Sequence, residues 1–145
     1  MKAIFAALIV FISCNAWSAD YQSEIDNFFS LYKAEKIDEA VSGIYSTNPY
    51  VSAIPDQVKQ IKTQLAALKD LVGELNHIDK IDTYAVGDSF IHLTYLVTYD
   101  RQPIRFEFQF FKVKQGWRIY SMSFDDDLTD EIKSLAREAA LKAAN

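Results

Sequence analysis

The chain has 145 residues, half of them hydrophobic, with ten Phe and eight Tyr, and a formal net charge of −5. This length and composition are typical of one domain with its own core. The acidic balance argues against nucleic acid or an anionic lipid surface as partner, because both are bound through clustered Lys and Arg.

Residues 1–19 have the three-part pattern of a secretory signal peptide: Lys2, an apolar run over residues 3–12, and then small or polar residues. We expect cleavage after Ser18 or Ala19. The apolar run is shorter than the roughly 20 residues that span a bilayer, and no later run is longer, so we expect no membrane span. The prediction is a single domain over residues 20–145, located in the periplasm or outside the cell.

Cys14 allows a second interpretation of the same segment. It follows Phe11-Ile12-Ser13, a setting in which a lipoprotein signal places its lipidated cysteine, although Phe11 stands where Leu is usual. After ordinary cleavage the chain keeps no cysteine, hence no disulfide and no cysteine-based metal site or nucleophile. Cleavage also removes Lys2 and no acidic residue, so the net charge changes from −5 to −6.

The first half of the domain has helical spacing. Apolar residues recur over residues 21–45 as one bent or two short helices, which end at Asn48-Pro49. A further helix is predicted to begin near Pro55. Its apolar residues alternate steps of four and three and form one stripe, namely Ile54, Val58, Ile61, Leu65, Leu68, Val72 and Leu75. We expect this stripe to pack in the core, with a coiled-coil partner as the alternative.

After residue 76 the period changes to two. Residues 78–86, 90–99, 104–113 and 117–124 are predicted to be antiparallel strands, joined by turns at Gly87-Asp88, residues 100–103 and Gln115-Gly116. A last helix is predicted over residues 128–143. The carboxylates at its start suit the positive end of a helix dipole, and their spacing lacks the glycine and the closing Glu of a calcium loop.

Pairing the strands predicts one strongly apolar face. We expect Tyr99 opposite Ile104, which sets Val97 opposite Phe106, Tyr95 opposite Phe108 and Leu93 opposite Phe110. A turn at Gln115-Gly116 then sets Phe110 opposite Ser121 and Phe108 opposite Ser123. The volume beside the small serines is filled by helix side chains or remains as a pocket. Candidate ligand-binding residues are Tyr84, Tyr95, Tyr99, Phe108, Phe110, Ser121 and Ser123.

The opposite face of the sheet is predicted to be mixed. It carries the polar residues His92, Thr94, Thr98, Arg105, Glu107 and Gln109, and the large apolar residues Phe90, Phe111, Val113, Tyr120, Met122 and Phe124. Either the C-terminal helix or a second copy of the chain is expected to cover it. His77 and His92 lie on different elements without supporting cysteines, so we assign no metal, no triad and no cofactor.

The segment from Asp88 to Leu128 contains GDSFIHLTYLVTYD and PIRFEFQFFKVKQGWRIYSMSFDDDL. With the order of elements, it resembles uncharacterised exported bacterial members of the nuclear transport factor 2-like superfamily. The resemblance implies an α+β fold in which N-terminal helices pack on a curved, cone-like sheet of four antiparallel strands, with a C-terminal helix. The superfamily includes ketosteroid isomerase-like enzymes, which need a carboxylate base in an apolar pocket; Asp82 is the candidate if it faces the apolar side.

Three functions remain open. The first is a noncatalytic exported domain that binds a small apolar molecule or a protein, with a homodimer through the outer sheet face as one form. The second is a ketosteroid isomerase-like or related cone-fold enzyme, for which no catalytic residue is assigned. The third is an inhibitor of a secreted protein partner. A buried carboxyl with a raised pKa would favour the enzyme.

Overall fold

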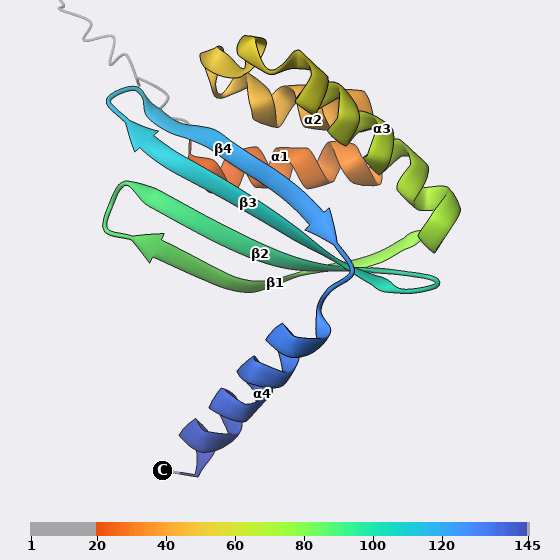
Figure 1. The fold of residues 1–145 in the computed structure, drawn as a ribbon, viewed down its shortest axis with the longest axis vertical. Coiled ribbons are helices and arrows are strands. Elements are labelled where there is room, and N and C mark those ends of the chain that lie inside the picture. Colours follow the sequence, from red (N-terminus) through yellow and green to blue (C-terminus); the bar gives the residue numbers. More distant parts are fainter. Residues whose placement is uncertain (1–19, 145) are drawn as a thin grey trace, which may run out of the picture.

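The structure, a computed structural model, describes residues 20–144, and these form an α+β fold (Figure 1). In chain order the elements are α1 (Tyr21–Lys33), α2 (Ile37–Ser46), the 3-10 helix η1 (Pro49–Ala53), α3 (Pro55–Val72), β1 (Leu75–Val86), β2 (Phe90–Tyr99), β3 (Pro103–Val113), β4 (Gly116–Asp125) and α4 (Thr129–Ala143). The predicted fold class is confirmed. The predicted signal peptide and Cys14 lie outside the described residues. Within residues 20–144, no helix combines the length and the hydrophobicity that crossing a membrane requires.

The first helical segment divides into two helices at Glu35. The Glu35 N–H donates to the Tyr32 carbonyl and the Lys36 N–H to the Leu31 carbonyl, both at 3.0 Å, which is the Schellman arrangement. Glu35 has a φ of +61°, and no other non-glycine residue in the described part of the chain has a positive φ. Glycine usually occupies this position, because a side chain there costs about 1 kcal/mol.

Helix α3 ends at Val72, earlier than the predicted stripe, and Gly73 follows it as the cap. Leu65, Leu68 and Val72 are buried as expected, but Leu75 belongs to β1 and not to the helix. Gly73 has a φ of +89°, and a Cβ placed on it would lie 2.8 Å from the Cβ of Asp100. Only glycine therefore fits where the chain leaves α3 and enters the sheet.

The four strands pair in the order β1-β2-β3-β4, all antiparallel, and α1, α2 and α3 cover one face (Figure 1). We call this helix-covered face the inner face. It holds alternate residues of the two central strands, all of them buried: Ile91, Leu93, Tyr95, Val97, Tyr99, Ile104, Phe106, Phe108 and Phe110. The alternation predicted for β2 and β3 is therefore correct.

The predicted register between β2 and β3 is wrong by two residues. Val97 lies opposite Ile104 and Leu93 opposite Phe108, whereas Tyr99 was expected opposite Ile104. The turn is tighter than predicted, because the Tyr99 N–H donates to the Gln102 carbonyl at 3.3 Å. A slip of two residues keeps every side chain on its predicted face.

The predicted register between β3 and β4 is wrong by one residue beyond an irregularity between Gln109 and Phe110. Ser121 lies opposite Gln109 and Ser123 opposite Glu107, so both serines are on the outer face and not opposite Phe110 and Phe108. Met122 and Phe124, expected outside, take the inner positions. Gly116 pairs with Val113 inside the strand, and Tyr120 is the extra residue of the bulge.

Aromatic rings from α1 fill the space above the inner face. The ring of Phe28 lies 5.3 Å from that of Phe108, and the ring of Phe29 lies 5.7 Å from the same residue. Phe28, Phe106, Phe108 and Phe110 have no exposed surface. The volume that the sequence left open beside Phe108 and Phe110 is therefore packed core.

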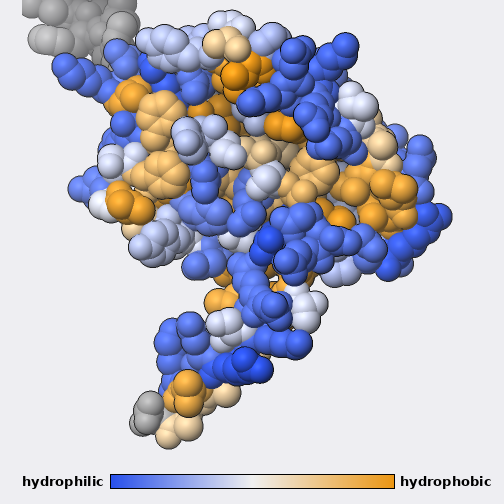
Figure 2. Space-filling view, viewed as in Figure 1, coloured by the Kyte–Doolittle hydropathy of each residue, from blue (hydrophilic) through white to orange (hydrophobic). Residues whose placement is uncertain are grey.

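Helix α4 leaves the end of β4 and extends away from α1, α2 and α3 (Figure 1). In the space-filling view it stands clear of the rest of the molecule (Figure 2). None of its residues is buried. Leu128, which is 7% exposed, and the pair between Arg105 Nη1 and Glu131 Oε2, at 2.8 Å, attach its start to the sheet. The expectation that α4 covers the outer face is wrong.

Candidate ligand-binding site

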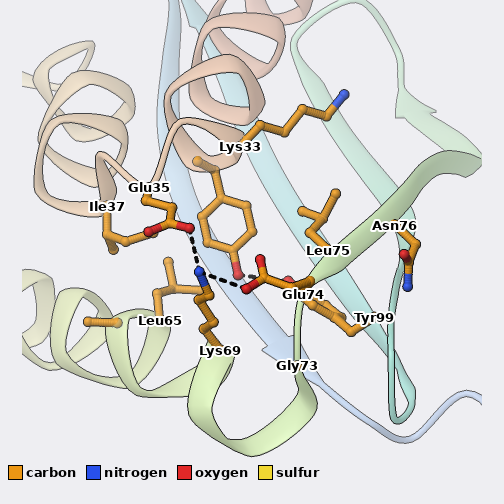
Figure 3. Close-up of a pocket in the computed structure, with 12 residues that line it drawn as sticks. Lys33, Glu35, Ile37, Leu65, Lys69, Gly73, Glu74, Leu75, Asn76 and Tyr99 are labelled. Atoms are coloured by element: carbon orange, nitrogen blue, oxygen red, sulfur yellow. Dashed lines mark hydrogen bonds and ion pairs between the residues drawn. The ribbon is translucent and has the colours of Figure 1, made fainter.

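A cavity of about 580 Å³ opens where α1, α2 and α3 meet the start of β1 and the end of β2 (Figure 3). Its apolar lining comes from Ile37, Leu65, Ala66 and Leu75 and from the rings of two tyrosines. Its polar lining consists of Lys33, Glu35, Lys69, Glu74 and Asn76. Its volume lies within the range of small-molecule sites.

The two tyrosines, Tyr32 and Tyr99, form a hydroxyl pair. Their Oη atoms are 2.7 Å apart, and each residue is 7% exposed. Burial raises the pKa of both hydroxyls, that of Tyr99 far above its usual value, and its bond to Tyr32 raises it further. Both are therefore protonated at neutral pH. One of the two hydroxyl hydrogens forms the hydrogen bond between the tyrosines. The other can be donated to an oxygen atom of a ligand.

Lys69 stands between two carboxylates at the mouth of the cavity. Its ammonium group donates to Glu35 and lies 3.0 Å from Glu74 Oε1, and Figure 3 shows it between the two. Hydrogen bonding to Glu35, then to Glu74, raises the pKa of Lys69 above its usual value. This trio, Glu35-Lys69-Glu74, has a net charge of −1, so it offers no free cation to an anionic ligand.

Asp100 organises the rim beside Gly73. Its carboxylate accepts from the Glu74 N–H at 3.0 Å and from Asn76 Nδ2 at 3.1 Å. These bonds, the Glu74 one first, lower the pKa of Asp100. The neighbouring Arg101 donates to the carbonyls of Asp70 and Leu71 at the end of α3. The rim thus fixes the end of α3 against the turn between β2 and β3.

The structure separates the predicted ligand-binding residues into four places. Tyr99 lines the cavity. Tyr95 accepts from Gln22 Nε2 at 3.3 Å and lines a more open depression between α1 and β1. Phe108 and Phe110 lie in the packed core.

The remaining predicted residues, Tyr84, Ser121 and Ser123, lie on the outer face. Tyr84 is 64% exposed and pairs with His92, and the Ser123 hydroxyl lies 3.4 Å from Glu107 Oε2. Asp82 pairs with Thr94 on the same face, because a shift between Lys80 and Asp82 changes the register of β1. It therefore does not face the apolar side.

Sequence reasoning missed Tyr32 and the trio Glu35-Lys69-Glu74. Tyr32 is one of the apolar residues in the helical spacing over residues 21–45, but it lies 67 residues from Tyr99 along the chain. No sequence period links residues on α1, α3 and the start of β1. Gly73 was a usable signal, since a glycine after a helical stripe commonly marks a helix end.

A polar network occupies the outer face near α4. Arg105 lies 2.9 Å from Asp125 and 2.8 Å from Glu131, and its Nε is 3.8 Å from Glu107. His92 Nε2 lies 3.2 Å from Glu107, and His92 Nδ1 is 3.1 Å from Gln109 Nε2. Within residues 20–144, no group of three or more His, Cys, Asp or Glu is arranged to hold a metal ion.

No protein-family model matches the chain, and no curated protein sequence matches it significantly. Three solved structures share low similarity with it. A DUF4783 family protein from Bacteroides uniformis is 13% identical over 48% of this chain and 62% of its own, with a TM-score of 0.38. A phospholipid-binding protein from Ralstonia solanacearum, in complex with a phospholipid, is 16% identical over 88% and 89%, with a TM-score of 0.46. A Thiobacillus denitrificans protein, named for the association domain of calcium/calmodulin-dependent protein kinase type II, is 10% identical over 71% and 91%, with a TM-score of 0.47.

Proposed function

We propose that this chain is an exported, noncatalytic domain that binds a small, mostly apolar molecule in the cavity beside Tyr32 and Tyr99. The observation that carries the proposal is the protonated hydroxyl pair, which lies with Ile37, Leu65, Ala66 and Leu75 in the wall of a cavity of about 580 Å³. Such a cavity favours a ligand with an apolar body and one oxygen that accepts a hydrogen bond.

The charges at the mouth narrow the ligand class to neutral molecules. Lys69 is already bound by Glu35 and Glu74, so a carboxylate or phosphate ligand would have to displace one of them. Lys33, the other cation of the lining, points its ammonium group away from Lys69 and from the two tyrosines (Figure 3). A carbonyl or hydroxyl group on an aliphatic or ring system therefore fits best.

A noncatalytic role is supported by the carboxylates at the cavity. Glu35 and Glu74 have side chains that are each 67% exposed, and both pair with Lys69. A general base for isomerase chemistry needs a carboxylate inside the apolar volume. The ketosteroid isomerase-like alternative is therefore the weaker proposal.

The binding experiment uses three probes with one chain length: decanol, decanoate and decylamine. Isothermal titration calorimetry on the purified protein is expected to show tightest binding for decanol. Tyr99→Phe should weaken decanol binding by about 2-fold to 10-fold, the effect of one net hydrogen bond. Tyr84→Phe, on the outer face, is the matched control and should bind like the wild type.

A second variant, Ala66→Trp, places an indole at the cavity wall and should abolish binding without touching the core around Phe108. Equal decanol binding by the wild type, Tyr99→Phe and Ala66→Trp would mean that decanol binds at another site. Binding of none of the probes by the wild type would count against ligand binding at this cavity.

Export is supported by the N-terminal sequence pattern alone and is part of the same proposal. The intact mass of the protein recovered from its native cells should correspond to a chain that begins at Ala19 or Asp20. A chain that begins at a lipid-modified Cys14 would support the lipoprotein alternative, and an uncleaved chain would contradict export.

Association through the outer face is a second candidate, whether with a second copy or with a secreted protein that the chain inhibits. It rests on exposed apolar side chains there: Tyr84 is 64% exposed, Tyr120 65% and Val86 54%. The ring of Tyr120 lies 6.1 Å from that of Phe90 and 6.4 Å from that of Phe111. A Tyr120→Asp variant that loses self-association, or loses a partner in the native envelope, would support it.

A further inference from the structure

Helix α4 has an apolar stripe that its own chain covers only in part. Ile132, Leu135, Ala136, Ala139 and Ala143 lie within about 100° of one another on the helix surface. Ile132 is 42% exposed and Leu135 36% exposed. An isolated 15-residue helix has marginal stability in water, so we expect another surface to pack against the stripe.

Side-chain size along the stripe is graded. The large side chains, Ile132 and Leu135, come in its first half, and its second half consists of alanines at 136, 139 and 143. Two such helices packed antiparallel set the large residues of one against the alanines of the other. Packed parallel, they would set large against large and leave the alanine half with little contact.

Charge along the helix is graded in the same direction. Residues 126–131 contain four carboxylates, and residues 133–142 contain three cations and one carboxylate. Antiparallel packing brings the acidic end of one copy to the basic half of the other. Glu131 and Lys142 also lie on the same flank of the stripe, and in an antiparallel pair related by two-fold symmetry the same flanks face each other.

We infer that α4 pairs antiparallel with α4 of a second copy of this chain. Size and charge both make the helix complementary to itself in that orientation, which is what a two-fold contact requires. The contact is small, since α4 is only about 22 Å long, and we expect a dissociation constant in the micromolar range. The inference does not depend on ligand binding at the Tyr32 and Tyr99 cavity.

Sedimentation equilibrium of the purified protein up to about 100 µM tests the pairing. The wild type should form a dimer, and Leu135→Asp should weaken it at least tenfold. Ser134→Asp adds the same charge on the opposite side of α4 and should remain dimeric. Circular dichroism should show that both variants keep the fold, because neither residue 134 nor residue 135 is buried.

Disulfide formation tests the orientation. In a Cys14→Ser background, Lys133→Cys protein mixed with Ala140→Cys protein should form the mixed disulfide in preference to either self-disulfide. Both positions lie on one flank of the stripe, and neither change disturbs the pair between Arg105 and Glu131. Predominance of the self-disulfides would mean parallel helices and overturn the inference.

If α4 packs against a different surface, or against none, the same measurements give other results, and each of these would contradict the pairing. A monomer at every concentration, with α4 amides protected from hydrogen exchange, would mean that the helix lies on its own sheet. A monomer with unprotected α4 would mean that the stripe has no partner. A dimer that survives Leu135→Asp and dissociates with Tyr120→Asp would place the contact on the outer face.

Discussion

The two faces of the sheet use similar residues in opposite ways. On the inner face, Phe106, Phe108 and Phe110 are fully buried under α1 and hold the helices to the strands. On the outer face, aromatic residues of the same strands, such as Phe111 and Tyr120, form an open cluster. We therefore expect an aromatic side chain on this sheet to stabilise the fold only where a helix covers it.

Truncating one ring on each face tests this comparison most directly. Phe108→Ala should lower the free energy of unfolding by roughly 3–5 kcal/mol, because it opens a cavity among rings that cannot close around it. Tyr120→Ala should change it by no more than about 0.5 kcal/mol, because the ring is exposed. Urea unfolding of both variants measures the difference, and equal costs would show that the outer cluster is also covered in solution.

Arg105 is expected to be the outer-face residue that matters most for stability. It lies between Asp125 and Glu131 and is 19% exposed, so Arg105→Gln leaves two carboxylates without their partner. We expect a loss of about 1–2 kcal/mol and a looser attachment of α4. Hydrogen exchange in residues 128–135 would detect that loosening, whereas unchanged exchange would mean that Leu128 alone anchors the helix.

The smallest expected effect is a pH dependence at the rim of the cavity, on the helix-covered side. Because the folded-state pKa of Asp100 is lowered, its contribution is present above the unfolded pKa of about 4 and is lost as pH falls through the folded value. Asp100→Asn should therefore flatten the stability profile below about pH 4. An identical acid profile for variant and wild type would mean that the bonds to Glu74 and Asn76 do not form in solution.

Most of the fold could be predicted because its signals are local. The alternation in β2 and β3 named the inner-face residues, and Pro55 marked the start of α3. Registers could not be predicted, because they depend on which residues form each turn. Gly116 was assigned to a turn and is in a strand, an error of two residues that by itself keeps every side chain on its predicted face. The extra residue at Tyr120 is what places the two serines on the outer face.

The cavity was predicted only through Tyr99. Its other defining residues come from separate elements whose approach depends on the tilt of α1 against the sheet, and no periodic pattern encodes that tilt. Glu35 shows the difficulty most clearly. A sequence rule places glycine at the end of such a helix, whereas the residue present is a glutamate that bonds to Lys69 on another helix.

The extra residue at Tyr120 has a consequence for how the chain tolerates insertions and deletions. In a regular strand, the loss of one residue moves every following side chain to the other face of the sheet. Deleting Tyr120 would instead leave Ile119 opposite Phe110 and Ser121 opposite Gln109, so Met122 and Phe124 would keep their inner positions. Asp125 would also stay opposite Arg105, so β4 can lose this one residue without releasing the C-terminal helix.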